Sequence, residues 1–245
     1  MENQGKILLY DGSFNGFLTT IYEIYEKNII VMNIQKTGTC QNALFTEIDT
    51  IGTQVAKAER VWNNLRHKNY NALKNIYFAF LSEQKSIEWL LYQYIQKLYA
   101  RDVMADLYDE NTTALKIGQI AKAVEREKLS LEAKLQFQIT EDDVYLEIIE
   151  PEFNIIPLVS KHFRTLHRGK EWIIYDAKRN YGIHYCGGAM EFVVLDLENN
   201  FLFEHKRKDR KKIRKDHNPE LWNDYFKSNH IRSRIHKMLP SRAVA

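Results

Sequence analysis

The stretch that decides the fold class lies in the second half of the chain, where residues 172–186 read WIIYDAKRNYGIHYC. Apolar and aromatic residues dominate its two ends, and the polar residues 177–180 separate them. Short runs rich in β-branched and aromatic residues, joined by a polar turn, are typical of neighbouring strands. We therefore expect two paired strands here, the centre of a small, antiparallel sheet.

Further elements are expected on both sides of these two strands. Residues 144–149 and 192–197 have the composition of strands, and residues 155–166 between them have apolar residues at helical spacing. A closing helix is expected from Pro219 through Phe226, because proline is well tolerated at the first helical position.

The first half of the chain instead reads as a short strand over residues 6–10 followed by helices. The expected helices cover about 14–25, 55–65, 70–81, 82–98 and 113–137. Their expected caps are Ser13 for the first, Asp49 or Thr50 for the second, Ser82 for the fourth, and Thr112 or Thr113 for the last. Residues 28–48 show no clear periodicity, so no element is assigned to them.

Together these elements predict an α+β fold, with a mainly helical N-terminal half followed by a small antiparallel sheet with flanking helices. We expect one domain over residues 1–200, helical in 1–140 and sheet-containing in 141–200. Residues 201–245 are expected to form a basic, partly helical C-terminal segment.

The charge is unevenly distributed along the chain. The formal total is +3, but residues 201–245 carry 13 Lys and Arg against five Asp and Glu, a net +8, which leaves −5 for residues 1–200. A basic segment on an acidic body indicates a polyanionic partner. Two cysteines are too few for a disulfide framework, and we expect no signal peptide and no membrane partner, hence a cytoplasmic protein.

Several stretches, none of them specific alone, together resemble one protein family. They occur in the family's order and extend over most of residues 7–228. They are LYDGSF (9–14), GFL (16–18), RVW (60–62), AFLSE (79–83), Val124 with RE (126–127), IEPEFN (149–154), HF (162–163), WIIYD (172–176), KR (178–179), YG (181–182), LW (221–222) and YFKS (225–228).

The family that these stretches resemble is a bacterial domain of unknown function, labelled a putative DNA repair or probable DNA metabolism protein. The resemblance implies a DNA-linked role beside a radical-SAM protein, and some relatives are fused to a uracil-DNA-glycosylase domain. It implies a possible family site at Arg126, Glu127, His162, Arg179 and Tyr181, without a catalytic mechanism. The chain departs from the pattern at Leu129-Ser130, where relatives tend to carry His-Arg, and at its C-terminus, which lacks their aromatic ending.

A carboxylate pair with a lysine indicates an enzymatic alternative. Glu152 follows one expected strand, and Asp176 ends another, two residues before Lys178. Metal-dependent nucleases use two carboxylates to hold Mg²⁺ and a lysine to stabilise charge. A charged turn and a loop would give the same residues, so both interpretations stay open, and Mg²⁺ is expected only with the first.

Other cofactor patterns are absent from the sequence. His162, His167, His184 and Cys186 lie in one region, but their spacing matches no zinc motif, so no metal ligand is assigned. Two cysteines do not supply the three-cysteine motif of a radical-SAM enzyme, so we expect the chain to accompany that chemistry rather than catalyse it. No P-loop or dinucleotide fingerprint is present, and no cofactor is expected.

The run 205–215 carries eight Lys and Arg and one Asp. Cations at this density displace counterions from nucleic acid and give salt-sensitive binding. The expected nucleic-acid contacts are Lys206, Arg207, Lys208, Arg210, Lys211, Lys212, Arg214, Lys215, Arg232 and Arg234. A solvated segment that only aids solubility is the other interpretation.

Three functions therefore follow from the sequence. The first is a DNA-associated accessory partner of a radical-SAM enzyme. The second is an enzyme, either a metal-dependent nuclease or a base-processing protein. The third is a protein-docking module without nucleic-acid contact.

Overall fold

A computed structural model describes residues 5–38, 47–100, 112–139 and 143–194. The fold is mixed α+β with two sheets, which confirms the expected class. The chain divides into two compact units, residues 1–126 and residues 127–245, so the division falls within helix α5 (Thr112–Lys134). In the described ranges, no helix has the length and apolarity needed to cross a bilayer.

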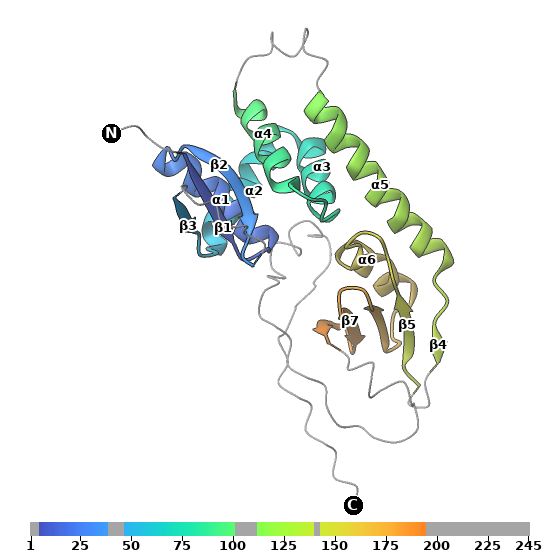
Figure 1. The fold of residues 1–245 in the computed structure, drawn as a ribbon. Coiled ribbons are helices and arrows are strands. Elements are labelled where there is room, and N and C mark those ends of the chain that lie inside the picture. The colour runs from blue at the N-terminus through green and yellow to red at the C-terminus, as the bar shows by residue number, and fades with distance from the viewer. Residues whose placement is uncertain (1–4, 39–46, 101–111, 140–142, 195–245) are drawn as a thin grey trace, which may run out of the picture. The chain divides into compact units, whose positions relative to one another are not determined.

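A three-stranded parallel sheet lies in the first unit, with the order β2–β1–β3 (Figure 1). Its strands are β1 (Lys6–Tyr10), β2 (Val31–Lys36) and β3 (Ile48–Thr50). Only β1 was expected from the sequence. The expectation that Asp49 or Thr50 caps a helix is wrong, because both residues pair with β1, opposite Leu8 and Leu9.

The helices of the first unit follow the expected pattern closely. They are α1 (Phe14–Lys27), α2 (Val55–Lys68), α3 (Tyr70–Phe80), α4 (Ile87–Tyr99) and the first part of α5. The Ser13 hydroxyl caps α1 by accepting the Gly16 N–H at 2.9 Å, as expected. Ser82 does not begin a helix, because its hydroxyl donates to the Ala79 carbonyl and α4 starts only at Ile87.

Aromatic side chains from three helices fill the core of the first unit. The ring of Phe14 in α1 lies 5.0 Å from those of Tyr77 and Phe80 in α3, and 6.0 Å from Trp62 in α2, measured between centroids. All four side chains are buried. Such edge-to-face contacts add to the free energy of apolar burial and fix the helices relative to one another.

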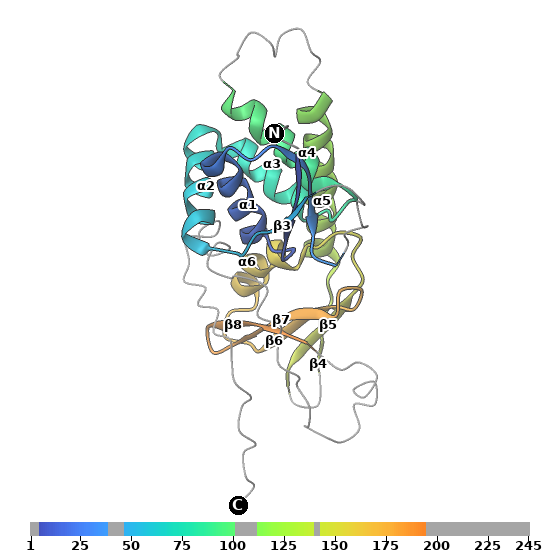
Figure 2. The same cartoon turned by 60° about the vertical axis from the view of Figure 1, so that its left-hand side comes forward.

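A five-stranded sheet of order β4–β5–β6–β7–β8 forms the second unit (Figure 2). Its strands are β4 (Gln138–Ile139), β5 (Tyr145–Ile149), β6 (Trp172–Asp176), β7 (Tyr181–Cys186) and β8 (Ala189–Val193). Three of the pairings among these strands are antiparallel, as expected, but β5 and β6 are parallel. The reason is the helix α6 (Ile156–Leu166), which returns the chain between them.

Helix α6 covers one face of this sheet. Val159 and Phe163 pack there against Trp172, Ile174 and Ile183, all buried. The opposite face carries a smaller apolar cluster of Leu146, Ile173 and Tyr175. The strand expected over 192–197 is β8, which begins earlier, whereas the expected helix from Pro219 and the whole segment 201–245 lie outside the described residues.

Candidate functional site

The parallel pairing of β5 and β6 brings two of the singled-out segments to the same edge of the sheet. Ile149, the last residue of β5, is paired with Asp176, the last residue of β6. The pairing continues one step further, because the Ala177 N–H donates to the Ile149 carbonyl at 2.9 Å. Residues 150–154 and 177–180 therefore leave the sheet side by side.

Asp176 is fully buried and is paired with Arg179. Arg179 Nη1 lies 2.9 Å from Asp176 Oδ2, and the Arg179 backbone N–H donates to Oδ1 at 3.1 Å. A buried carboxylate without a partner is strongly destabilising. The pair therefore stabilises the turn 177–180 and fixes the direction of the guanidinium.

That guanidinium contacts the loop that follows β5. Arg179 Nη1 donates to the Pro151 carbonyl at 3.2 Å, and Nη2 donates to the Glu152 carbonyl at 2.9 Å. Lys178 Nζ donates to the same Glu152 carbonyl at 3.2 Å. Two cationic side chains thus bind backbone carbonyl oxygens of residues 150–154. We call these residues the clamped loop.

Glu127, in α5, binds backbone N–H groups of the clamped loop. Its Oε1 accepts the Glu152 N–H at 2.6 Å, and its Oε2 accepts the Phe153 N–H at 2.9 Å. Charge-assisted bonds of this kind are about twice as strong as neutral ones. At the loop's end, the Tyr181 hydroxyl donates to the Asn154 side chain. Carboxylate, guanidinium and phenol together fix one loop conformation.

The structure thus brings six of the eight residues predicted as catalytic or family-site residues to one place. Those that meet at the clamped loop are Glu127, Glu152, Asp176, Lys178, Arg179 and Tyr181. His162 is exposed on α6, and Arg126 is exposed at the end of the first unit.

The two carboxylates of the nuclease alternative differ in environment. Glu152 is exposed, whereas Asp176 is buried and has both oxygens bonded to Arg179. The part of the chain that the structure describes contains a single group of three potential metal donors from His, Cys, Asp or Glu, and neither residue belongs to it. The clamped loop thus presents Glu152 on a rigid support, while Asp176 stabilises that support.

A second feature of this unit is a run of cations without an acidic residue. Residues 161–170 read KHFRTLHRGK and cover the end of α6 and the turn after it. We call its six cationic or titratable side chains the basic ridge: Lys161, His162, Arg164, His167, Arg168 and Lys170. His162, Arg168 and Lys170 are exposed, and the other three are half-buried.

In the basic ridge, burial and neighbouring positive charges lower the pKa values of two side chains. Burial lowers the pKa of His167 most, and Lys170 and His162 lower it further. Burial also lowers the pKa of Arg164, with a contribution from Arg168, while Tyr185 opposes the shift. A bound anion would relieve this repulsion, so the ridge is suited to phosphate. Sequence reasoning selected only His162, although the lack of any Asp or Glu over ten residues was visible.

The ten residues expected to contact nucleic acid, from Lys206 to Arg234, lie outside the described residues, and their role stays a prediction.

Residues 85–244, more than half of the chain, match a family described as a domain of unknown function, DUF4130. The match includes the clamped loop and the basic ridge. No curated protein matches the chain. The expected membership in a family of unknown function is confirmed at this level: the chain belongs to the DUF4130 family.

Proposed function

We propose that this protein is a cytoplasmic, DNA-associated accessory partner of a radical-SAM enzyme of DNA modification or repair. The observation that carries the proposal is the concentration of positive charge: residues 201–245 have a net charge of +8 on a body of −5. The basic ridge adds an acid-free run of cations within the described part of the chain.

Both features favour a ligand with regularly spaced negative charge. Lys and Arg that neutralise phosphates release counterions, which supplies affinity without sequence preference. The radical-SAM partner and the link to uracil-DNA-glycosylase domains rest on the family resemblance. The two cysteines of the chain are consistent with a partner rather than a carrier of the iron–sulfur cluster.

The clamped loop supports the nuclease alternative in one respect. It places the exposed Glu152 and the Lys178 ammonium on the same short loop system. The burial and pairing of Asp176 favour a structural role for that residue, so a nuclease would need further metal ligands from substrate or solvent.

Fluorescence anisotropy with short single- and double-stranded DNA tests the proposal. The proteins compared are the full chain and a full-length variant in which the eight Lys and Arg of 205–215 are changed to Gln. We expect the full chain to bind at low salt and the variant to lose most of that affinity. Mg²⁺ is added in a parallel series to detect cleavage.

Each outcome separates the three functions. Salt-sensitive binding without cleavage supports the accessory role, and Mg²⁺-dependent cleavage would favour the nuclease. No binding of the full chain at low salt would contradict a direct DNA role and favour a module that docks only to protein.

A further inference from the structure

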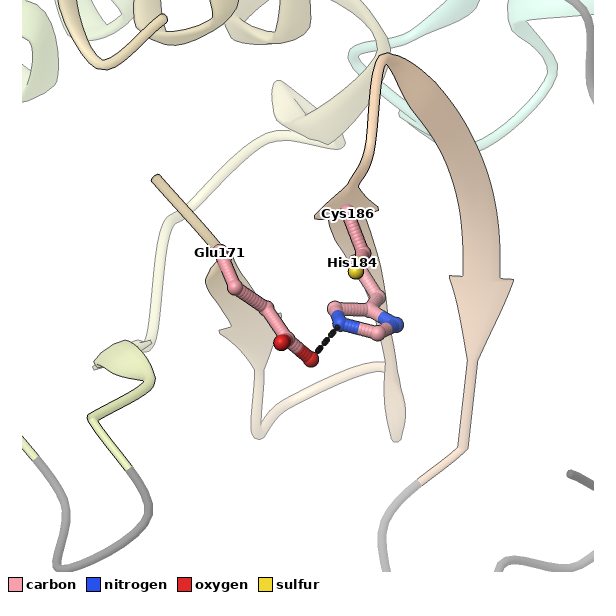
Figure 3. Close-up of side chains that lie close together, drawn as sticks. All are labelled: Glu171, His184 and Cys186. Carbon is pink, nitrogen blue, oxygen red and sulfur yellow. Dashed lines mark hydrogen bonds and ion pairs between the residues drawn. The ribbon is translucent and has the colours of Figure 1, made fainter. Parts of the chain in front are cut away.

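Three side chains with metal-binding atoms meet at one end of the β6–β7 hairpin. Glu171 directly precedes β6, His184 lies within β7, and Cys186 ends β7. One donor atom from each lies within 4.8 Å of the other two. Figure 3 shows the carboxylate of Glu171 directed at the His184 ring, with the Cys186 sulfur beside that ring.

The strand register explains why these residues meet although their spacing matches no motif. Residues two apart on a strand point to the same face, so His184 and Cys186 share one. Trp172 is paired with Tyr185, which places Glu171 opposite Cys186 at the next position. His184 is paired with Ile173, whose side chain belongs to the cluster on the face away from α6. The three donors therefore gather on the face that the helix leaves uncovered.

The environment of each donor suits coordination. His184 is buried, and its Nε2 lies 2.7 Å from Glu171 Oε1, so a carboxylate already orients the ring. Glu171 is half-buried and Cys186 is exposed, which leaves access from solvent. Across β7, Glu191 is paired with His184 and brings a second carboxylate to the same face.

We propose that Glu171, His184 and Cys186 bind one zinc-type divalent ion. Thiolate, imidazole and carboxylate together form a donor set that zinc accepts and that hard ions such as Mg²⁺ do not favour. Metal–ligand distances of about 2.0–2.3 Å imply donor separations of roughly 3.3–3.8 Å in a tetrahedral site. The widest pair, at most 4.8 Å apart, therefore closes by about 1 Å, while His184 Nε2 and Glu171 Oε1, which lie 2.7 Å apart, separate by about 0.6 Å. Rotation of the exposed Cys186 and the half-buried Glu171 side chains supplies this movement.

Binding would exchange protons for the ion. The Cys186 thiol proton passes to solvent. The proton between His184 Nε2 and Glu171 is also released to solvent while Nδ1 takes one up, so that the ring stays neutral and Nε2 binds the ion. Three protein ligands leave a fourth position for water, as in catalytic zinc sites, or for the Glu191 carboxylate.

Cobalt titration of the full-length protein tests the site, because a thiolate ligand gives Co²⁺ a charge-transfer absorption in the near ultraviolet. We expect this band to saturate at one Co²⁺ per chain and to vanish when Zn²⁺ is added. Cys186→Ser should abolish it, and Cys40→Ser, the matched control at the only other cysteine, should retain it. Since Cys186 is exposed, we expect its substitution to leave the fold intact.

Competition with a chromophoric chelator measures the other two ligands. Loss of an outer-sphere partner typically costs about 10–100-fold in metal affinity, so Glu171→Gln and His184→Gln should each cost at least about 100-fold for Zn²⁺. A charge-transfer band that survives in Cys186→Ser, or no band in the unmodified protein at saturating Co²⁺, would overturn the proposal. So would unchanged Zn²⁺ affinity in Glu171→Gln.

Discussion

Glu127 shows how a single side chain sets the geometry of the candidate site. It is one of five charged residues in the stretch 122–128, and the sequence alone gives a solvated helix face as the simplest explanation. In the structure, it accepts two backbone N–H groups of the clamped loop. Its role is therefore to order that loop, and the resemblance of Arg126-Glu127 to the family pattern gains a physical reason at Glu127.

Replacing Glu127 should destabilise the protein more than replacing a surface glutamate of the same helix. Hydrogen bonds to a charged group contribute about 1.5–3 kcal/mol, and Glu127→Ala leaves two donors of the clamped loop without this partner. The matched control is Glu125→Ala, which removes a part-exposed ion pair with Lys74 and should cost less than about 1 kcal/mol. Urea unfolding of both variants gives the comparison, and equal losses would contradict the clamp.

A buried glutamate of the first unit makes stability depend on pH. Glu23 is buried, and hydrogen bonds from Lys27 and then Lys57 hold its pKa below the ordinary value of 4.5, although burial opposes them. The folded-state pKa is thus lower than the unfolded one. The resulting stability is present above pH 4.5 and is lost as the pH falls through the folded pKa.

Chemical unfolding between pH 7 and pH 3 measures this contribution against Glu23→Gln, which has no such titration. The native protein should be more stable than the variant near neutral pH, and the difference should shrink on acidification. A difference that stays constant over this range would show that Glu23 is not the group responsible.

At the scale of elements, the basic ridge is the described feature most directly involved in the proposed DNA binding. Arg168→Glu with Lys170→Glu reverses two of its exposed cations. If both contact phosphate, the slope of log affinity against log salt should become shallower by about 2. The matched control, Lys85→Glu with Lys97→Glu, changes the net charge equally at two exposed residues of the first unit. Anisotropy with double-stranded DNA checks this, and equal effects of both variants would exclude a specific role for the ridge.

The helices and the β6–β7 hairpin were predictable, because their periodicity is strong and local. The cap of α1 at Ser13 and the hairpin over residues 172–186 are examples of such local signals. The parallel sheet of the first unit was not, since β3 has three residues and its pairing with β1 joins segments about 40 residues apart. Asp49 is thus a residue type that favours helix caps, but in the structure it lies in a strand.

The candidate sites likewise contain residues that the sequence predicted and residues that it did not. Asp176 and Lys178 were predicted together with Glu152 as a carboxylate pair with a lysine, whereas Arg179 was selected through the family resemblance. The structure adds that Arg179 neutralises Asp176. Glu171 was missed beside His184 and Cys186, because only the β6–β7 register brings it there. Cross-strand contacts of this kind become visible in a sequence only once the hairpin register is known.

At the scale of the whole molecule, three features bear on the proposed function. The clamped loop and the basic ridge are positioned by the sheet of the second unit, and the basic run 205–215 supplies most of the charge. The family match extends over all three. The proposed DNA partner is inferred from the charge distribution. The proposed metal site rests on other residues and does not depend on DNA binding.

The salt dependence of DNA binding by the full-length protein is the direct test of the proposed DNA partner. If the eight cations of 205–215 all contact phosphate, the slope of log affinity against log salt reaches about −7, because each contact contributes about −0.9. We predict a steep negative slope that flattens when those cations are changed to Gln. Affinity that does not change with salt, or a slope that the Gln variant retains in full, would contradict DNA binding by the basic run 205–215.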